Sequence, residues 1–161
     1  MKNIQTIKIN EGTNEKEAMR SLGRDRMFWA ESIACSLAQA KHNDVYSFRY
    51  DFEPLLMKLA GLKATHGVDI CSGHDTWSGG IYLFHVLTPK NRQQKIHNDM
   101  HGSFVNFCKT GEPGIVDGVK WQKYSNENRF TLLFNDKCGS VVNPYEKNYE
   151  IWKDLALYMR D

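Results

Sequence analysis

The stretch Val45-Tyr46-Ser47-Phe48-Arg49-Tyr50 lies between the turn-forming pair Asn43-Asp44 and Pro54. Because β-branched and aromatic residues favour extended backbone, this run predicts a strand over 45–50. The similar run Arg129-Phe130-Thr131-Leu132-Leu133-Phe134 predicts a second strand. A third short strand is predicted over 4–9, where apolar residues alternate loosely. The sequence therefore predicts a small sheet of two or three strands.

Three segments have the apolar spacing that is typical of helices. The first helix is predicted from Asp25, placed as an N-cap, to near 41–43. The second is predicted from Thr88-Pro89, with Thr88 as N-cap and Pro89 as the first helical residue, to Thr110-Gly111. The four glycines between 65 and 80 predict a loop with a short helix. A closing helix is predicted from the apolar stripe Tyr145, Tyr149, Trp152, Leu155 and Met159.

The composition places the chain among globular proteins, because 41% of its 161 residues are hydrophobic, and residues 1–161 are expected to form a single domain. The 21 Lys+Arg and 19 Asp+Glu residues are dispersed, so no nucleic-acid or membrane partner is predicted. The start of the chain lacks the order of a signal peptide, and a cytoplasmic location is expected. The cysteines lack metal or disulfide spacing, so reduced thiols are expected at Cys35, Cys71, Cys108 and Cys138.

Two groups of polar residues are candidates for chemistry. His97 and His101 lie four residues apart on the second helix, a spacing that suits zinc, but a third ligand is not evident and a solvated polar face is the simpler interpretation. A second group in the glycine-rich segment is consistent with a metal loop, a catalytic loop or a plain polar loop. It consists of His66, Asp69, His74 and Asp75. The sequence contains no G-x-S-x-G nucleophile elbow and no nucleotide-binding fingerprint.

Five segments, taken in order, resemble motifs of one enzyme family. They are Asp25 to Trp29, Val45 to Pro54, Ala64 to Ile70, Phe104 to Pro113 and Gly118 to Tyr124. These segments resemble the D-x-x-F helix start, the V-Y-x-Y-x-F-D strand, the A-x-H-x-x-E/D-L/I loop, the F-A-K-T-G-x-P helix end and the W-P-x-Y turn of type-B carboxylesterases, in particular para-nitrobenzyl-esterase-like bacterial members. The resemblance implies the C-terminal portion of an α/β-hydrolase fold, helix-rich with two or three strands.

The same resemblance implies ester hydrolysis by a Ser-Glu/Asp-His triad. His66 matches the triad histidine, Gly67 is expected to permit close backbone approach, and Asp69 matches an acidic residue that orients the loop. The nucleophile and oxyanion hole of the family lie in an N-terminal portion that this chain does not contain. The chain alone is therefore expected to be inactive, with that portion and a small carboxylic ester as its partners and with no cofactor.

Two segments depart from the family pattern. Where the family has Pro-Phe-Val-Phe-Gly, this chain has Cys71-Ser72-Gly73-His74-Asp75, so the resemblance does not imply the family's local helix and acyl-pocket wall. Gly12 to Glu17 is similar to the turn that carries the family's triad acid. Glu17, however, is only eight positions before Asp25, and the family places several helical turns between these motifs. Glu17 is therefore interpreted as part of a lead-in helix.

Two other functions remain open from the sequence. One is a non-enzymatic interaction domain, as in cholinesterase-like adhesion proteins, and the other is a metal-binding domain that uses His97 and His101. In an isolated chain, the strand over 45–50 would have an unpaired edge, which predicts self-association as a two-fold dimer. The alternative is a monomer in which residues 1–9 fold back as a substitute strand.

Overall fold

The computed structural model describes residue 19, residues 23–144, and residues 146, 149 and 150. The strand predicted over 4–9, the acid candidate Glu17 and most of the closing helix predicted over 145–159 lie outside the described residues. The chain forms two compact units, one made of 1–45, 124–129 and 143–161 and the other of 46–123 and 130–142. All predicted site residues lie in the second unit.

The helical segment of the first unit begins before Asp25. Gly23 and Arg24 are already helical, a π-helix η1 (Asp25–Trp29) follows, and α3 (Ala30–Gln39) continues it. Asp25 is therefore not the N-cap that the sequence predicted. Its buried carboxylate instead accepts a hydrogen bond of 3.1 Å from the neighbouring Arg24 Nε, which compensates its charge.

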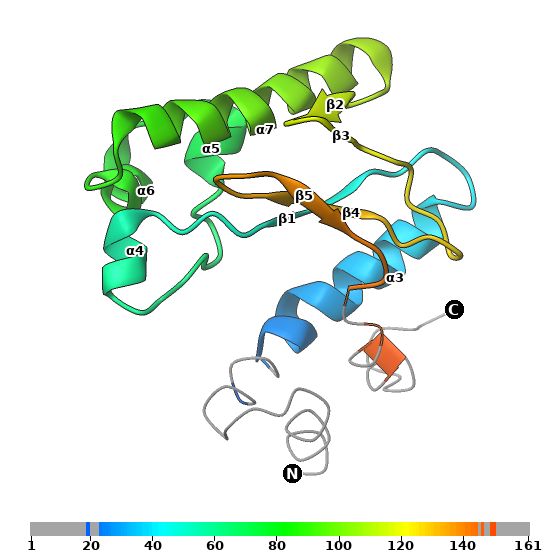
Figure 1. Cartoon of the computed structure of the whole chain (residues 1–161). Coiled ribbons are helices and arrows are strands. Elements are labelled where there is room, and N and C mark those ends of the chain that lie inside the picture. Colours follow the sequence, from blue (N-terminus) through cyan, green and yellow to red (C-terminus); the bar gives the residue numbers. More distant parts are fainter. Residues whose placement is uncertain (1–18, 20–22, 145, 147–148, 151–161) are drawn as a thin grey trace. The chain divides into compact units, whose positions relative to one another are not determined.

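The second unit is organised by a three-stranded sheet in the order β1-β4-β5 (Figure 1). Strand β1 (Ser47–Tyr50) pairs in parallel with β4 (Thr131–Phe134), and β4 pairs antiparallel with β5 (Gly139–Val141). The predicted strands over 45–50 and 129–134 thus become β1 and β4. Strand β5, with three residues, was not predicted from the sequence.

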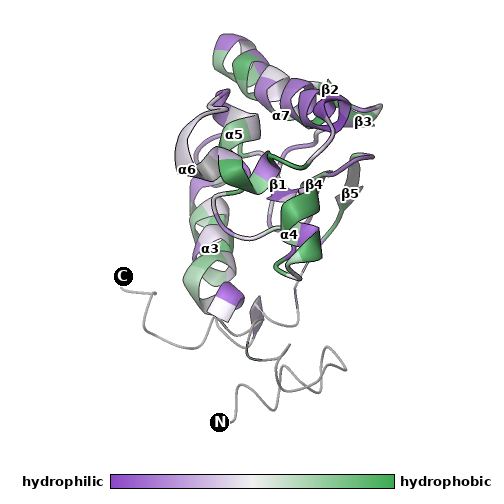
Figure 2. Cartoon of the chain, turned by 90° about the vertical axis from the view of Figure 1, so that its left-hand side faces the viewer, coloured by the Kyte–Doolittle hydropathy of each residue, from purple (hydrophilic) through white to green (hydrophobic). Residues whose placement is uncertain are grey.

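The remaining elements of the second unit are mostly short helices. They are α4 (Leu55–Leu59), α5 (Ile70–His74), α6 (Gly79–Tyr82), the 3-10 helix η2 (Leu83–His85), α7 (Lys90–Thr110), and a hairpin of β2 (Ile115–Val116) and β3 (Val119–Lys120). The long helix α7 carries both hydrophilic and hydrophobic residues, whereas α4 is largely hydrophobic (Figure 2). Gly111 ends α7 in the left-handed conformation and donates its N–H to Phe107 O at 2.8 Å, as the sequence predicts.

The start of α7 differs from the prediction by one position. Pro89 is the N-cap, because its ψ of 135° lies outside the helical region, and Lys90 is the first helical residue. The Thr88 hydroxyl does not cap α7. It accepts a 2.9 Å hydrogen bond from the backbone N–H of Leu55, the first residue of α4, and so ties the two helix starts together.

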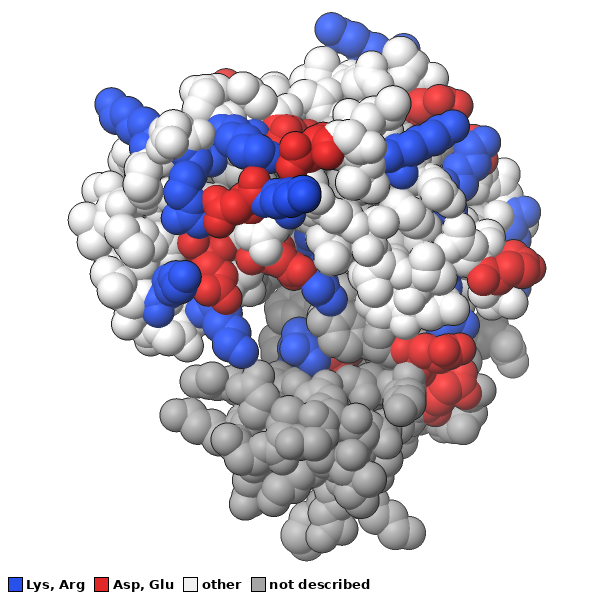
Figure 3. Space-filling view, in the orientation of Figure 1, with Lys and Arg blue, Asp and Glu red and all other residues white. Residues whose placement is uncertain are grey.

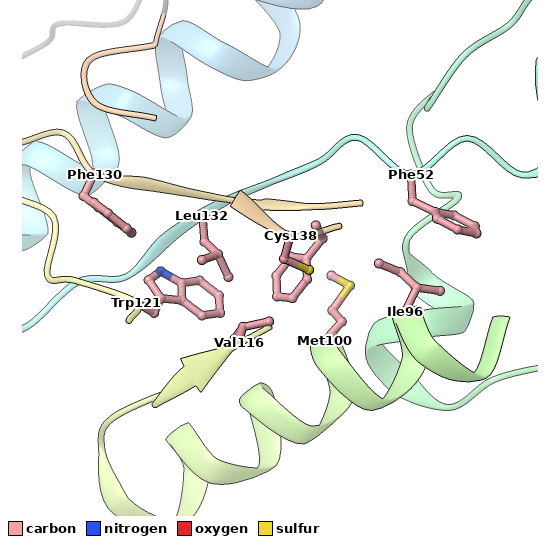
Figure 4. Packing of buried hydrophobic residues seen from close by; sticks show 9 residues of the cluster. Phe52, Ile96, Met100, Val116, Trp121, Phe130, Leu132 and Cys138 are labelled. Atoms are coloured by element: carbon pink, nitrogen blue, oxygen red, sulfur yellow. The ribbon is translucent and has the colours of Figure 1, made fainter. Parts of the chain in front are cut away.

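The core of the second unit lies between the sheet and α7 (Figure 4). Ile96 and Met100 of α7 point toward the sheet, and the Trp121 indole Nε1 donates a 3.0 Å hydrogen bond to Ser47 O of β1. The buried cluster comprises Phe52, Ile96, Met100, Val116, Trp121, Phe130, Leu132, Phe134 and Cys138. Because the packing includes Trp121 and β4, the sheet depends on residues that follow α7 in the sequence.

The surface of the described residues carries charges of both signs. Lys and Arg intermingle with Asp and Glu on the face in Figure 3. Arg92 pairs with Asp136 at 2.6 Å, and Lys95 contacts Asp99 and Asp117 at 2.7 and 3.1 Å. None of the described helices combines the length and the apolar character needed to cross a membrane.

The packing predicts that a leucine-to-alanine substitution changes the free energy of unfolding much more in the core than on the surface. Leu132 is 0% exposed in the central strand, whereas Leu59 is 72% exposed on α4. We expect Leu132→Ala to lower the free energy of unfolding by about 3 kcal/mol, through lost burial and a cavity, and Leu59→Ala to change it by less than about 0.5 kcal/mol. Urea denaturation of both variants measures the difference. Equal stability of the two variants would contradict the assigned core.

Candidate active site

His66 lies on an exposed turn between α4 and α5. The turn is closed by two long backbone hydrogen bonds, from Val68 N to Thr65 O and from Ile70 N to Gly67 O, each 3.3 Å. This placement agrees with the loop that the glycines between 65 and 80 predict, and the short helix α4 separates the turn from β1. An exposed imidazole on a turn can exchange a proton with a group that approaches from outside the chain.

Gly67 adopts a backbone conformation in this turn that favours glycine. Its φ of 84° is in the left-handed region, where side chains are strained. A Cβ at this position would meet only Ile70 Cδ1, at the ordinary contact distance of 3.8 Å, so close backbone approach does not explain the glycine within the described residues. Within these residues, the positive φ is the feature that favours a glycine.

Asp69 follows the turn at the N-cap of α5 and is half-buried. Its side chain makes no capping hydrogen bond to α5, although its backbone carbonyl accepts from Gly73 N at 2.9 Å. The carboxylate acts on Tyr50 at the end of β1: burial raises the pKa of the Tyr50 phenol, and the negative charge of Asp69 raises it further. Tyr50 therefore remains a neutral hydroxyl, and it shares a hydrogen bond of 3.1 Å with the buried Ser72 Oγ.

The segment that departs from the family pattern forms the helix α5, and it packs against α7. A Cβ on Gly73 would lie 3.1 Å from Phe104 Cε2 and 3.4 Å from Met100 Cε, so the glycine allows the two helices to approach closely. The helix ends at Asp75, whose φ of 56° is left-handed. The exposed His74 ring contacts the Phe104 ring edge-on, with centroids 6.3 Å apart.

His97 and His101 hold the carboxyl end of α5. His97 Nδ1 is 3.2 Å from Ser72 O and His101 Nδ1 is 3.0 Å from Gly73 O, so each ring nitrogen donates to a helix carbonyl. The two rings stack with centroids 5.0 Å apart. Both are half-buried in this contact. The interpretation of a solvated face is therefore wrong, because sequence spacing does not reveal which element covers a helix face.

A group of potential metal ligands in the described residues lies elsewhere, at Asp99, Asp117 and Cys138. The ammonium group of Lys95 binds both carboxylates, and Cys138 N donates to Asp117 at 2.9 Å. The ion pairs with Lys95 thus account for the close approach of these two carboxylates. A surface pocket of about 360 Å³ beside it is lined by residues such as Asn98, Ser103 and Asn106, and by none of the predicted site residues.

His85 is the residue of this region that sequence reasoning missed. It is 0% exposed, and its Nε2 lies 2.9 Å from Val68 O in the turn that carries His66. Burial lowers the pKa of His85, although the hydrogen bond to Val68 acts in the opposite direction. Its apolar neighbours Leu83, Val86 and Leu87 are themselves exposed, so the local pattern did not indicate that His85 is buried.

Comparison with known proteins confirms the predicted fold class, part of an α/β-hydrolase fold. The profile of the carboxylesterase family matches residues 2–152, and the chain belongs to this family. None of the curated proteins compared matches the chain.

Solved carboxylesterases share the fold. The chain superposes on carboxylesterase EST55 of Geobacillus stearothermophilus with a TM-score of 0.71 and 22% identity, over 87% of this chain and 28% of that one. A PNB esterase gives a TM-score of 0.72 at 20% identity, over 91% and 29% of the two chains. An esterase of Clostridium hathewayi that can hydrolyse aliphatic aromatic polyesters gives 0.56 at 23% identity, over 71% and 22%. The chain spans less than a third of the length of each.

The burial of the thiols predicts their reactivity. Cys35 and Cys108 are exposed, whereas Cys71 in α5 and Cys138 are buried, and burial raises the pKa of both buried thiols. We expect N-ethylmaleimide to modify Cys71 and Cys138 on the order of 100-fold more slowly than Cys35 and Cys108 under native conditions. Peptide mass spectrometry of a time course measures the four rates. Fast modification of Cys71 would show that α5 is not packed as described.

Proposed function

We propose that this chain supplies the histidine-bearing part of a carboxylic-ester hydrolase. In the assembled enzyme a serine Oγ, held by a segment that this chain does not contain, attacks the ester carbonyl. The imidazole of His66 accepts the serine proton as general base and returns it to the departing alcohol as general acid. An acid from elsewhere in the enzyme holds the imidazole tautomer, and Asp69 orients the turn.

The position of His66 supports this proposal most directly. The chain belongs to the carboxylesterase family, and His66 is an exposed histidine on a turn whose following helix is attached to β1 through Tyr50 and Ser72. A general base needs this combination of an accessible nitrogen and a fixed backbone. The sequence has no nucleophile elbow, so a base without its nucleophile is expected to be inactive alone.

The open edge of the sheet supports the proposal that the missing part of the hydrolase is the partner of this chain. Strand β1 has one neighbour, β4, in the described part of the chain, and Leu59 and Leu62 beyond it are 72% and 56% exposed. An open strand edge favours pairing with a further strand, and exposed apolar side chains favour burial in an interface. In the isolated chain the same edge favours a homodimer. It also supports a second candidate function, that of a non-enzymatic interaction domain.

Ester hydrolysis tests the proposal. We expect the purified chain to hydrolyse p-nitrophenyl acetate no faster than its His66→Ala variant, because nucleophile and oxyanion donors supply most of the rate. Coexpression with the polypeptide encoded directly upstream should give an active enzyme, and His66→Ala should lower its kcat by at least about 10³-fold. His42→Ala, a substitution of an exposed histidine in the first unit, is the matched control and should retain full activity.

Two results would overturn this assignment. Activity of the isolated chain that disappears in His66→Ala would reveal a nucleophile within the 161 residues. An upstream reading frame without a G-x-S-x-G elbow, or a complex that binds but hydrolyses no ester, would favour the interaction domain.

A further inference from the structure

The turn that carries His66 has weak support of its own. Its two backbone hydrogen bonds are both 3.3 Å long, at the outer limit of effective geometry, and the His66 side chain is exposed. Such a turn is held in one conformation only if neighbouring elements fix it. One such contact comes from His85, whose side chain reaches Val68 in this turn.

His85 reaches this turn from η2, 17 residues beyond Val68. A carbonyl oxygen only accepts, so His85 Nε2 carries the proton and donates it to Val68 O over 2.9 Å. Nδ1 is then the unprotonated nitrogen, and it is buried with no hydrogen-bond partner in the described structure. A leucine or phenylalanine at this position would avoid that unfavourable burial. The hydrogen bond to Val68 is thus the feature that explains a histidine here.

The His85 ring is itself fixed on two sides. It stacks on the fully buried Phe52 ring, with centroids 6.4 Å apart and planes 12° apart, and it meets the Trp77 ring edge-on at 5.3 Å. Its backbone is also held, since Gln93 Nε2 of α7 donates to His85 O at 2.9 Å. The imidazole therefore presents its Nε2–H in one direction, towards the turn.

We propose that His85 is a positioning residue, which fixes the turn carrying His66 through the hydrogen bond from its Nε2 to Val68 O. The catalytic consequence rests on the function proposed for His66, whereas the structural consequence does not. His85 acts through the turn and is not expected to touch substrate.

The thiol of Cys71 reports whether the turn and α5 are held in place. The variant His85→Leu removes the hydrogen-bond donor and fills much of the space of the imidazole with an apolar side chain. The variant His85→Gln keeps an N–H donor near the position of Nε2. We expect N-ethylmaleimide to modify Cys71 about 10-fold faster in His85→Leu than in the unmodified sequence, and at nearly the original rate in His85→Gln. The rate at Cys138, which lies in the core cluster beside the sheet, should not change in either variant.

Three outcomes of this labelling would overturn the proposal. An unchanged Cys71 rate in His85→Leu would show that the hydrogen bond does not hold the segment. An equal increase at Cys71 and Cys138 would show that His85 supports the whole unit. An increase at Cys71 in His85→Gln as large as that in His85→Leu would show that the donor is not what matters.

Activity separates this inference from the proposed function. In the coexpressed enzyme, His85→Leu should lower kcat about 10-fold with KM unchanged, because a loosened turn misplaces the base without altering ester binding. His85→Gln should recover most of this loss. An unchanged kcat in His85→Leu, with a strong effect of His66→Ala, would overturn the positioning role alone. No effect of His66→Ala would overturn the proposed function, and the Cys71 rates would still decide whether His85 fixes the turn.

Discussion

The parallel pairing of β1 with β4 is the constraint on which the second unit depends. It aligns Ser47 with Thr131 and Tyr50 with Phe134, residues separated by 84 positions in the sequence. A parallel pair cannot be closed by a tight turn, so the intervening chain must cross over the sheet, and here it does so through α4 to α7 and the hairpin. The candidate site lies in this crossover, which explains why its segments depend on contacts with distant residues.

The crossover is fixed to the sheet by two kinds of contact. Apolar packing holds α7, through Ile96 and Met100 against the buried face of β4. Single hydrogen bonds attach other parts of the crossover to β1, between Tyr50 and Ser72 and from Trp121 to Ser47. A further bond, from Leu55 N to Thr88, ties α4 to the start of α7. The helices α4, α5 and α6 have only four or five residues each, too few to be stable alone, so these bonds and the packing decide where they lie.

The sequence predicted the elements with strong local signals. Strands β1 and β4 followed from their aromatic and β-branched runs, and α7 from its apolar spacing and Gly111. The order of five motifs was sufficient to predict the fold class. Local patterns could not show that Thr88 binds α4, or that His97 and His101 face α5, because these contacts join residues far apart in the sequence. His85 was missed for the same reason, because its role depends on Val68, a tertiary neighbour that no spacing rule identifies.

A fluorophosphonate probe tests most directly the proposal that His66 of this chain activates a serine held by another polypeptide segment. The probe forms a covalent adduct with an activated serine, and mass spectrometry of the coexpressed complex locates the adduct and gives its rate of formation. We expect rapid modification of one serine in the upstream polypeptide, and at least about 10³-fold slower modification in the His66→Ala complex. An adduct on a serine of this chain, or an equal rate in the two complexes, would contradict it.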